Sequence, residues 1–182
     1  ATPPLEAKKM LFSLAVTEGV GFNGNRKDGM KIDFIDIRRA YFHAKAHRPV
    51  FVELPEEEAE EGMCGELMKS MYGTRDAAQN WEKEYCEFLE NSGFKRGIAT
   101  PCAFFNKGRN LRVVVHGDDF SVLGYGKDLD WFRGMIQSRY EIKGERIGPG
   151  KNDRKEARIL NRIVEWGEEG ITYEPDQRHA EI

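Results

Sequence analysis

The sequence predicts an α+β protein with a mainly antiparallel sheet. Segments whose apolar residues recur at helical spacing are interspersed with short β-prone runs, and several neighbouring runs are separated only by short polar or glycine-containing turns. Strands joined by short turns pair antiparallel, and the interspersed helices then cover the sheet. The chain has 182 residues and neither an internal repeat nor a low-complexity linker, so we expect a single domain over residues 1–182.

The N-terminal half begins with a predicted helix. Leu11, Leu14 and Ala15 share one helical face, and Thr2 is a candidate N-cap. A β-prone apolar run follows, and a later run between two prolines is limited to a short or edge strand. The elements expected in this half are a helix at 5–15, a polar turn at 23–29, a strand at 31–36, a short helix at 38–46 and a short strand at 49–55.

The C-terminal half contains the clearest helix, because Ala77, Trp81 and Tyr85 recur at helical spacing. Asp76 is a candidate N-cap, and Gln79 three positions later completes a pair that resembles a capping box. The elements expected in this half are a helix at 76–91, strands at 102–105, 111–115 and 120–124, a helix at 128–140, a polar loop at 144–153 and a hairpin of 158–166 with 171–174.

Composition restricts the class of protein. Apolar residues make up 40% of the chain and charged residues 32%, which is typical of a globular protein. We expect no membrane association, because no apolar run approaches the length of a membrane span. The net charge of −3 does not by itself favour nucleic-acid binding, but much of the acidity lies in the run 56–61, and a basic groove elsewhere stays open.

Cysteine usage indicates the cellular setting. Cys64, Cys86 and Cys102 are widely spaced and form no Cys-x-x-Cys pair, and the histidines do not complete a zinc-finger spacing. We therefore expect reduced structural thiols in an intracellular protein.

Two adjacent aspartates between apolar runs are the main candidate for chemistry. His116 and Gly117 precede Asp118 and Asp119, and β-prone runs flank the four residues on both sides. A strand, a turn with two carboxylates and a second strand could bind divalent cations and position a triphosphate. The same residues also fit an ordinary hairpin turn.

Nucleotidyl transfer needs carboxylates from more than one strand. Two Mg²⁺ ions clamp the attacking and leaving oxygens, and Mg²⁺ prefers hard oxygen ligands. Asp33 and Asp36 are the upstream candidates. Residues three apart on a strand point to opposite faces, so we expect only one of the two to join Asp118 and Asp119.

Four segments carry a resemblance to a known family. Residues 36–42 are similar to motif A of reverse transcriptases, with the pattern Asp-x-x-x-Ala-Phe/Tyr, and residues 116–119 lie where the family has Tyr-Val-Asp-Asp. Residues 69–81 resemble the Leu-Tyr-Gly-Leu-Lys-Gln-Ala-Pro-Arg-x-Trp signature of copia-type retrotransposon polymerases, and residues 50–55 resemble that family's Val-Tyr-Met-x-x-Pro segment. All four follow in the family's order, so nearly the whole chain resembles a copia-type reverse transcriptase.

The resemblance implies a fold, an activity and a set of site residues. It implies a polymerase palm with partial fingers and a largely absent thumb, which adds deoxynucleoside triphosphates to a primer on a nucleic-acid template. Asp36, Asp118 and Asp119 match the family's metal-binding aspartates, and the backbone carbonyl of Ile37 matches a further ligand of Mg²⁺, or of Mn²⁺ in its place. Tyr41 matches the steric gate, whose ring leaves no volume for a 2′-hydroxyl.

The match also has departures. The family's glutamine and proline in the Tyr-Gly signature are Asp76 and Ala78 here, so the role of positioning the nucleotide passes to Gln79. Gly117 replaces a bulkier residue, which gives the Gly-Asp-Asp form typical of viral RNA-dependent RNA polymerases.

The ends of the chain extend the resemblance. Residues 156–176 are similar to a primer-grip hairpin, with Trp166 and Gly167 as the candidate contacts, and residues 176–179 resemble the start of a thumb. The chain begins with Ala1 rather than methionine. We expect it to be part of a larger polyprotein, located in the cytoplasm, in a particle or in the nucleus.

The function of the chain, the role of His116 and the role of three aromatic residues stay open at the sequence level. The chain could be an inactive or repurposed remnant that binds nucleic acid or protein, or it could be a Gly-Asp-Asp RNA polymerase. His116 is either a proton donor or metal neighbour, or a solvent-facing strand residue. Trp81, Tyr85 and Phe88 either stack on bases or form core, and their helical spacing favours the core.

Overall fold

Three α-helices and eleven short strands make up the part of the chain that the computed structural model describes, residues 5–22, 24, 29–160 and 162–174. This architecture confirms the predicted α+β class. The predicted Thr2 cap and the thumb-like residues 176–179 lie outside the described residues, as does most of the turn at 23–29. In chain order the elements are α1 (Leu5–Val16), β1 (Lys31–Ile37), η2 (Ala40–His43), β2 (Phe51–Val52), β3 (Gly65–Glu66), α2 (Ala77–Asn91), β4 (Lys95–Arg96), β5 (Ala103–Asn106), β6 (Leu111–His116), β7 (Asp119–Gly124), α3 (Gly126–Gln137), β8 (Ile142–Ile147), β9 (Glu156–Ile159), β10 (Arg162–Trp166) and β11 (Ile171–Tyr173).

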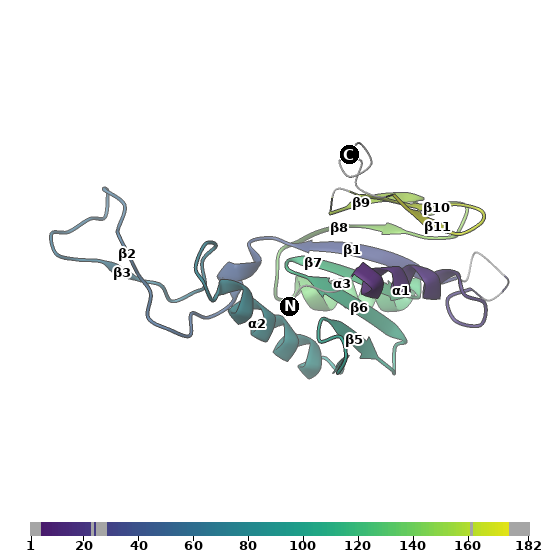
Figure 1. Cartoon of the computed structure of the whole chain (residues 1–182), viewed down its shortest axis with the longest axis horizontal. Helices are drawn as coiled ribbons and strands as arrows, with labels where there is room; N and C mark the ends of the chain where they lie inside the picture. Colours follow the sequence, from purple (N-terminus) through teal and green to yellow (C-terminus); the bar gives the residue numbers. More distant parts are fainter. Residues whose placement is uncertain (1–4, 23, 25–28, 161, 175–182) are drawn as a thin grey trace.

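A six-stranded sheet forms the centre of the molecule, in the order β4-β5-β6-β7-β1-β8 (Figure 1). Every neighbouring pair in this sheet is antiparallel, as predicted. A second sheet contains β11, β10 and β9, and a third contains only β2 and β3. The chain therefore builds its sheet mostly from hairpins, and β1 enters between β7 and β8.

An apolar core lies on each face of the central sheet. On one face, α2 and α3 pack through residues such as Trp81 and Phe132. On the other face, α1 and the β9–β11 sheet pack through residues such as Leu11 and Val164. The alternation of side chains along β1 serves both cores, because Ile35 contributes to the first core and Phe34 to the second.

The predicted loop at 144–153 is wrong in its first part, where β8 runs from Ile142 to Ile147. β8 pairs with β1 alone and forms an edge of the central sheet. An edge strand tolerates charged side chains, and Lys143, Glu145 and Arg146 mask the apolar alternation that would have indicated a strand.

Two other predicted elements are shorter or divided. The predicted helix at 38–46 is a single 3₁₀ turn, Ala40–His43, that follows Arg39 in a left-handed conformation with φ of 54°. The predicted strand at 158–166 divides into β9 and β10, which pair with each other, and Leu160 between them has φ of 47°. The predicted hairpin of β10 with β11 is confirmed.

The N-terminus of α2 departs from the predicted capping box. The Asp76 side chain makes no capping hydrogen bond to the helix backbone. It instead pairs with Nε of Arg48 at 3.1 Å and accepts a hydrogen bond of 3.1 Å from Nδ2 of Asn80. The Asp76 carboxylate, which the sequence predicts to cap the helix backbone, is thus bound by a guanidinium group and a side-chain amide instead.

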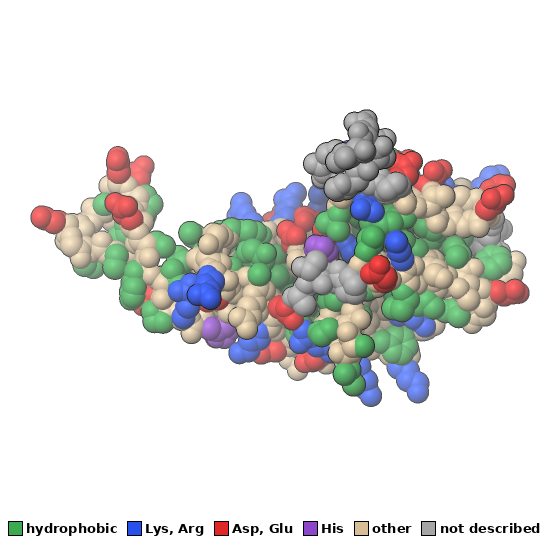
Figure 2. Space-filling view, in the orientation of Figure 1, with side chains coloured by type: hydrophobic (Ala, Val, Ile, Leu, Met, Phe, Trp, Pro, Cys, Tyr) green, Lys and Arg blue, Asp and Glu red, His purple; other side chains and the backbone are tan. Residues whose placement is uncertain are grey.

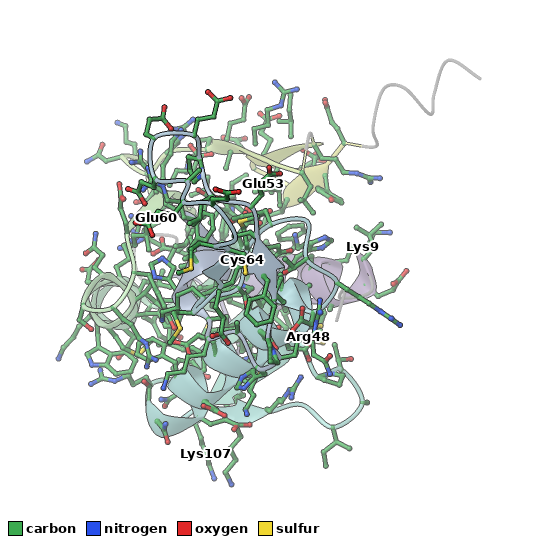
Figure 3. All side chains as sticks on the ribbon, turned by 90° about the vertical axis from the view of Figure 1, so that its left-hand side faces the viewer. Lys9, Arg48, Glu53, Glu60, Cys64 and Lys107 are labelled. Carbon is green, nitrogen blue, oxygen red and sulfur yellow. The ribbon has the colours of Figure 1, made fainter. Side chains whose placement is uncertain are left out.

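An arm that contains β2 and β3 projects from the body of the protein (Figure 1). Acidic side chains gather at its end (Figure 2), and Figure 3 shows Glu53, Glu60 and Cys64 on it. All three cysteines are free thiols, as predicted, with Cys86 and Cys102 buried and Cys64 exposed. Within the described ranges, none of the helices is both long and apolar enough to cross a bilayer.

Asp33 links β1 to neighbouring elements on the face of the sheet that α2 and α3 cover. Its side chain is 0% exposed, and its carboxylate accepts hydrogen bonds from Nε and Nη2 of Arg146 at 2.5 and 3.0 Å and from Nε of Arg133 at 2.6 Å. Arg146 belongs to β8 and Arg133 to α3. One carboxylate therefore joins three elements, and its charge is balanced where water cannot reach it.

We expect Asp33→Ala to lower the free energy of unfolding by about 3 kcal/mol, because the change leaves two partly buried guanidinium groups without their shared anion. Urea denaturation followed by circular dichroism measures the change. Asp130→Asn is the matched control, since Asp130 pairs with the same Arg146 but is 71% exposed, and we expect less than about 1 kcal/mol. Equal losses for the two variants would contradict an anchoring role of Asp33.

Candidate active site

Strands β1 and β7 bring two of the predicted carboxylates side by side. In their antiparallel register Asp36 lies directly opposite Asp119, and Asp118 precedes Asp119 in the turn between β6 and β7. Residues directly opposite in such a pair have Cβ atoms about 5 Å apart. The amide of Ile37 donates a hydrogen bond of 3.0 Å to the carbonyl of Asp118, which ties the turn to the end of β1. Asp36, Asp118 and Asp119 thus come together, and we call them the carboxylate group.

Asp33 and Asp36 separate to opposite faces, as their spacing predicts. Phe34 packs in the core beneath α1, and Asp36, two residues later, lies on the same face of β1. Asp33 lies on the face of Ile35, where it binds Arg133 and Arg146. Only Asp36 is therefore available to the carboxylate group.

The carboxylates repel one another. Burial raises the pKa of Asp36, and the neighbouring charge of Asp118 raises it further. Burial also raises the pKa of Asp119, where Lys8 opposes the rise and Asp118 and Asp36 add to it. Such a concentration of negative charge in a partly desolvated place favours the binding of a cation.

The turn that carries Asp118 is held from below by α2. Gly117 has φ of 64°, a conformation that side chains with a Cβ atom rarely adopt, which explains the glycine. Nε1 of Trp81 donates a hydrogen bond of 2.8 Å to the carbonyl of Gly117. Trp81 is 1% exposed and packs against Tyr85 and Tyr140, so the predicted core role of the tryptophan is confirmed.

The donor chemistry of the carboxylate group fits Mg²⁺ or Mn²⁺. Its ligands are carboxylate oxygens, with the carbonyl of Ile37 as the predicted addition, and hard divalent cations prefer oxygen. Among the described residues, no three His, Cys, Asp or Glu side chains are already arranged to hold an ion. The backbone register nevertheless places Asp36 opposite Asp119, with Asp118 next to Asp119 in the turn.

Tyr41 lies in η2, just after the end of β1, and its ring packs against another aromatic ring. Its ring packs on Tyr72 with centroids 4.3 Å apart, and Phe42 meets the same Tyr72 ring edge-on at 5.5 Å. Burial raises the pKa of Tyr72, and Asp118 raises it further, which places this ring near the carboxylates. Tyr41, the predicted steric gate, is therefore one of two packed rings, and the sequence indicates Tyr72 only within the signature at 69–81.

Gln79 lies apart from this group. It is exposed in the first turn of α2, and no hydrogen bond or ion pair of the described residues connects it to the carboxylates. Its neighbour Asn80 is buried and donates to Oγ of Ser70 at 3.0 Å. The assignment of nucleotide positioning to Gln79 stays a prediction.

A cavity of about 620 Å³ opens next to the carboxylate group. Asp36 and Asp119 line one part of it, and the basic side chains Lys143, Arg154 and Arg158 line the part formed by β8, β9 and the segment before β9. Nη1 of Arg154 pairs with Glu145 at 2.7 Å, which leaves Lys143 and Arg158 as the less engaged cations. Anionic and cationic side chains therefore share one hollow, an arrangement suited to a ligand that carries both a metal ion and phosphates.

The primer-grip candidates lie elsewhere. Trp166 is 7% exposed and belongs to the core beneath α1. Gly167 borders a separate cavity of about 160 Å³, together with Trp166, Val16 and Pro149. It is Arg158 and Ile159 of β9 that reach the cavity of the carboxylates.

Sequence reasoning missed four basic residues of the site. Lys143 and Arg154 belong to none of the elements that the sequence predicts, and Arg158 has no predicted role beyond its strand. Lys8 on α1 was not singled out, although it lies three positions before Leu11 and therefore on the buried side of the helix. His116 is half-buried at the end of β6 opposite Asp119, and burial lowers its pKa, with Lys8 adding to the effect.

Comparisons with known proteins agree with this geometry. The model of the family described as "Reverse transcriptase (RNA-dependent DNA polymerase)" matches residues 20–147, which include β1, the β6–β7 turn and α2. The retrovirus-related Pol polyprotein from transposon TNT 1-94 of Nicotiana tabacum is 22% identical over 129 residues, which cover 67% of this chain and 10% of the polyprotein. The chain thus spans about a tenth of the length of this curated relative. It belongs to the reverse transcriptase (RNA-dependent DNA polymerase) family, as a region of the copia type.

Proposed function

We propose that this chain holds the nucleotidyl-transfer site of an RNA-directed DNA polymerase, as part of a larger retrotransposon polyprotein. The observation that carries the proposal is the register in which Asp36 lies opposite Asp119, at one end of a cavity with basic residues. The substrates would be a primer paired to its template and deoxynucleoside triphosphates. The membership of the family supports the class of reaction.

The carboxylate group supplies the ligands for the reaction. When bound, two Mg²⁺ ions would hold the attacking 3′-hydroxyl and the leaving oxygen and stabilise the charge that develops on the phosphate. Asp36 and Asp119 present oxygens from two strands, and Asp118 adds a third carboxylate from the turn. Trp81 and the Ile37 amide fix that turn, so the ligands are positioned by the core rather than by a loose loop.

Tyr41 is suited to select the sugar. Its ring is held by Tyr72 behind it and follows Asp36 by five positions, on the turn that leaves β1. A deoxyribose packed against the ring fits, whereas a ribose would bring its 2′-hydroxyl into the volume of the ring. Discrimination by volume needs a rigid wall, and the packed pair of rings would provide one.

The basic part of the cavity is suited to the phosphates of the primer strand. Lys143 and Arg158 lie beside the carboxylates, and a primer whose 3′ end reaches Asp36 and Asp119 would carry its last phosphates past them. The net charge of −3 is compatible with this role, because acidic side chains gather on the projecting arm instead. Local positive charge, and not net charge, sets the affinity for a phosphate backbone.

A second candidate function is a binding module without catalysis. The observation that favours it is the lack, among the described residues, of three side chains already arranged around a metal point. In that case the cavity would still bind template–primer, and the carboxylate group would bind no ion at physiological concentrations. The two functions differ in primer extension.

We expect the purified chain to extend a DNA primer in the presence of Mg²⁺, and Asp118→Asn to lower the rate at least about a hundredfold, because a metal ligand is lost while the fold is kept. Gel-based primer extension on an RNA template measures the rate. Asp130→Asn, an exposed acid on α3, is the control and retains full activity. Equal rates for wild type and Asp118→Asn would exclude the proposed reaction. Template binding without extension in the wild type would favour the binding module.

We expect Tyr41→Ala to relax the preference for deoxynucleotides over ribonucleotides by roughly tenfold or more, because the ring no longer fills the space of the 2′-hydroxyl. The ratio of kcat/KM for the two nucleotides measures the effect. Phe42→Ala is the control, since Phe42 contacts Tyr72 from the other side. A wild type that already prefers ribonucleotides would point to an RNA-dependent RNA polymerase instead.

Lys143→Gln and Arg158→Gln should each weaken template–primer binding at low salt and reduce the slope of log affinity against log salt by about one, because each removes one phosphate contact. Fluorescence anisotropy at several salt concentrations gives the slope. Lys107→Gln is a suitable control, because Lys107 lies exposed in the turn after β5 (Figure 3) and does not line this cavity. If all three variants change the slope alike, binding is not localised to the cavity.

A further inference from the structure

Lys8 is a buried lysine on α1. It is the one charged residue among the five buried positions of α1, and it is 2% exposed. Within the described part of the chain, its Nζ atom has no hydrogen-bond acceptor. The other buried side-chain nitrogen in this state, Nη2 of Arg133, belongs to a guanidinium that Asp33 already binds. Lys8 is therefore a charged group that makes no hydrogen bond within the residues that the structure describes.

Lys8 lies on the helix that covers the strands of the carboxylate group. α1 packs against β6 and β7 on the face to which Asp36 and Asp119 point. The charges that act between Lys8 and its surroundings are those of Asp119 on β7 and His116 on β6, which are opposite each other in register. Burial lowers the pKa of Lys8, and Asp119 opposes this effect. The negative neighbour thus favours the charged form of a lysine that burial alone would discharge.

Packing gives no reason for a lysine at this position. The other buried residues of α1 are Ala7, Leu11, Phe12 and Ala15, so an apolar side chain would complete the same face. An unpaired ammonium in such a place opposes folding, because it loses its hydration and gains no hydrogen bond. A residue that destabilises the fold and adjoins the site is expected to serve the site.

We propose that Lys8 is a resident counter-cation of the carboxylate group, a positioning residue that balances one of its three negative charges before a divalent ion binds. The inference rests on the proposed function. In the ion-free protein, the positive charge of Lys8 reduces the electrostatic repulsion among the three carboxylates. When a divalent ion is bound, the same charge opposes it, so Lys8 holds the affinity for the ion low enough for exchange. Lys8 thus acts through Asp119 and does not touch the substrates.

The test is a titration of the whole chain with Mn²⁺, followed by electron paramagnetic resonance of the free ion, at one pH well above the pKa range of the carboxyls. We expect Lys8→Met to bind Mn²⁺ roughly three- to tenfold more tightly, since one repelling charge is removed. Lys8→Gln, also uncharged, should behave as Lys8→Met does. Lys9→Met is the matched control, because Lys9 is the next residue of α1 and extends outward from the helix (Figure 3), and its affinity should equal that of the wild type.

Thermal unfolding provides a second readout. Lys8→Met should raise the melting temperature, because the buried ammonium is replaced by an apolar side chain of similar length. An unchanged or weaker Mn²⁺ affinity of Lys8→Met and Lys8→Gln, with Asp118→Asn weakening it as expected, overturns the role of Lys8 and leaves the proposed function intact. A wild-type chain whose Mn²⁺ binding is insensitive to Asp118→Asn overturns both.

Discussion

The register of β1 against β7 is the constraint on which the candidate site depends. It places Asp36 opposite Asp119, and it would fail with a shift of one residue, because such a shift moves every side chain of β1 to the other face. Two features on the face that α2 and α3 cover resist that shift. Asp33 binds arginines from β8 and α3, and Ile35 packs in the core with α2 and α3. Residues of β1 that hold the fold together, Asp33 and Ile35, thus point to one face of the strand, and the candidate metal ligand Asp36 points to the other.

The β6–β7 turn depends on the same core from the other side. Trp81 reaches from α2 to the carbonyl of Gly117, and the Ile37 amide reaches the carbonyl of Asp118. Two backbone carbonyls of a short turn are therefore bound by separate elements. This explains how Gly117, a residue with wide conformational freedom, occurs in a turn that must hold a carboxylate in place. It also gives the tryptophan of the signature a physical role that base stacking would not provide.

Charge balance is the second theme of the site. Asp36, Asp118 and Asp119 concentrate negative charge where burial already raises the pKa of two of them. Two sets of basic side chains balance this group: Lys8 of α1, on which the charge of Asp119 acts, and the basic residues that line the cavity. The acidic residues of the arm lie at its end, away from the body of the protein (Figure 2). A chain with a negative net charge can therefore present a local surface for phosphates.

The sequence by itself determined the α+β class, the bounds of β1 and the separation of Asp33 from Asp36, because side-chain alternation is a local property of a strand. It also determined the family, through motifs whose order is linear. It failed at β8, since the apolar pattern of an edge strand is weak, and at Asp76, since Arg48 competes with the helix backbone for the carboxylate. Only the tertiary structure decided that Lys8, Lys143 and Arg158 adjoin the carboxylates. These three residues and the carboxylates come from distant parts of the chain. Their burial and their electrostatic neighbours therefore depend on how the elements pack, and no local sequence pattern indicates them.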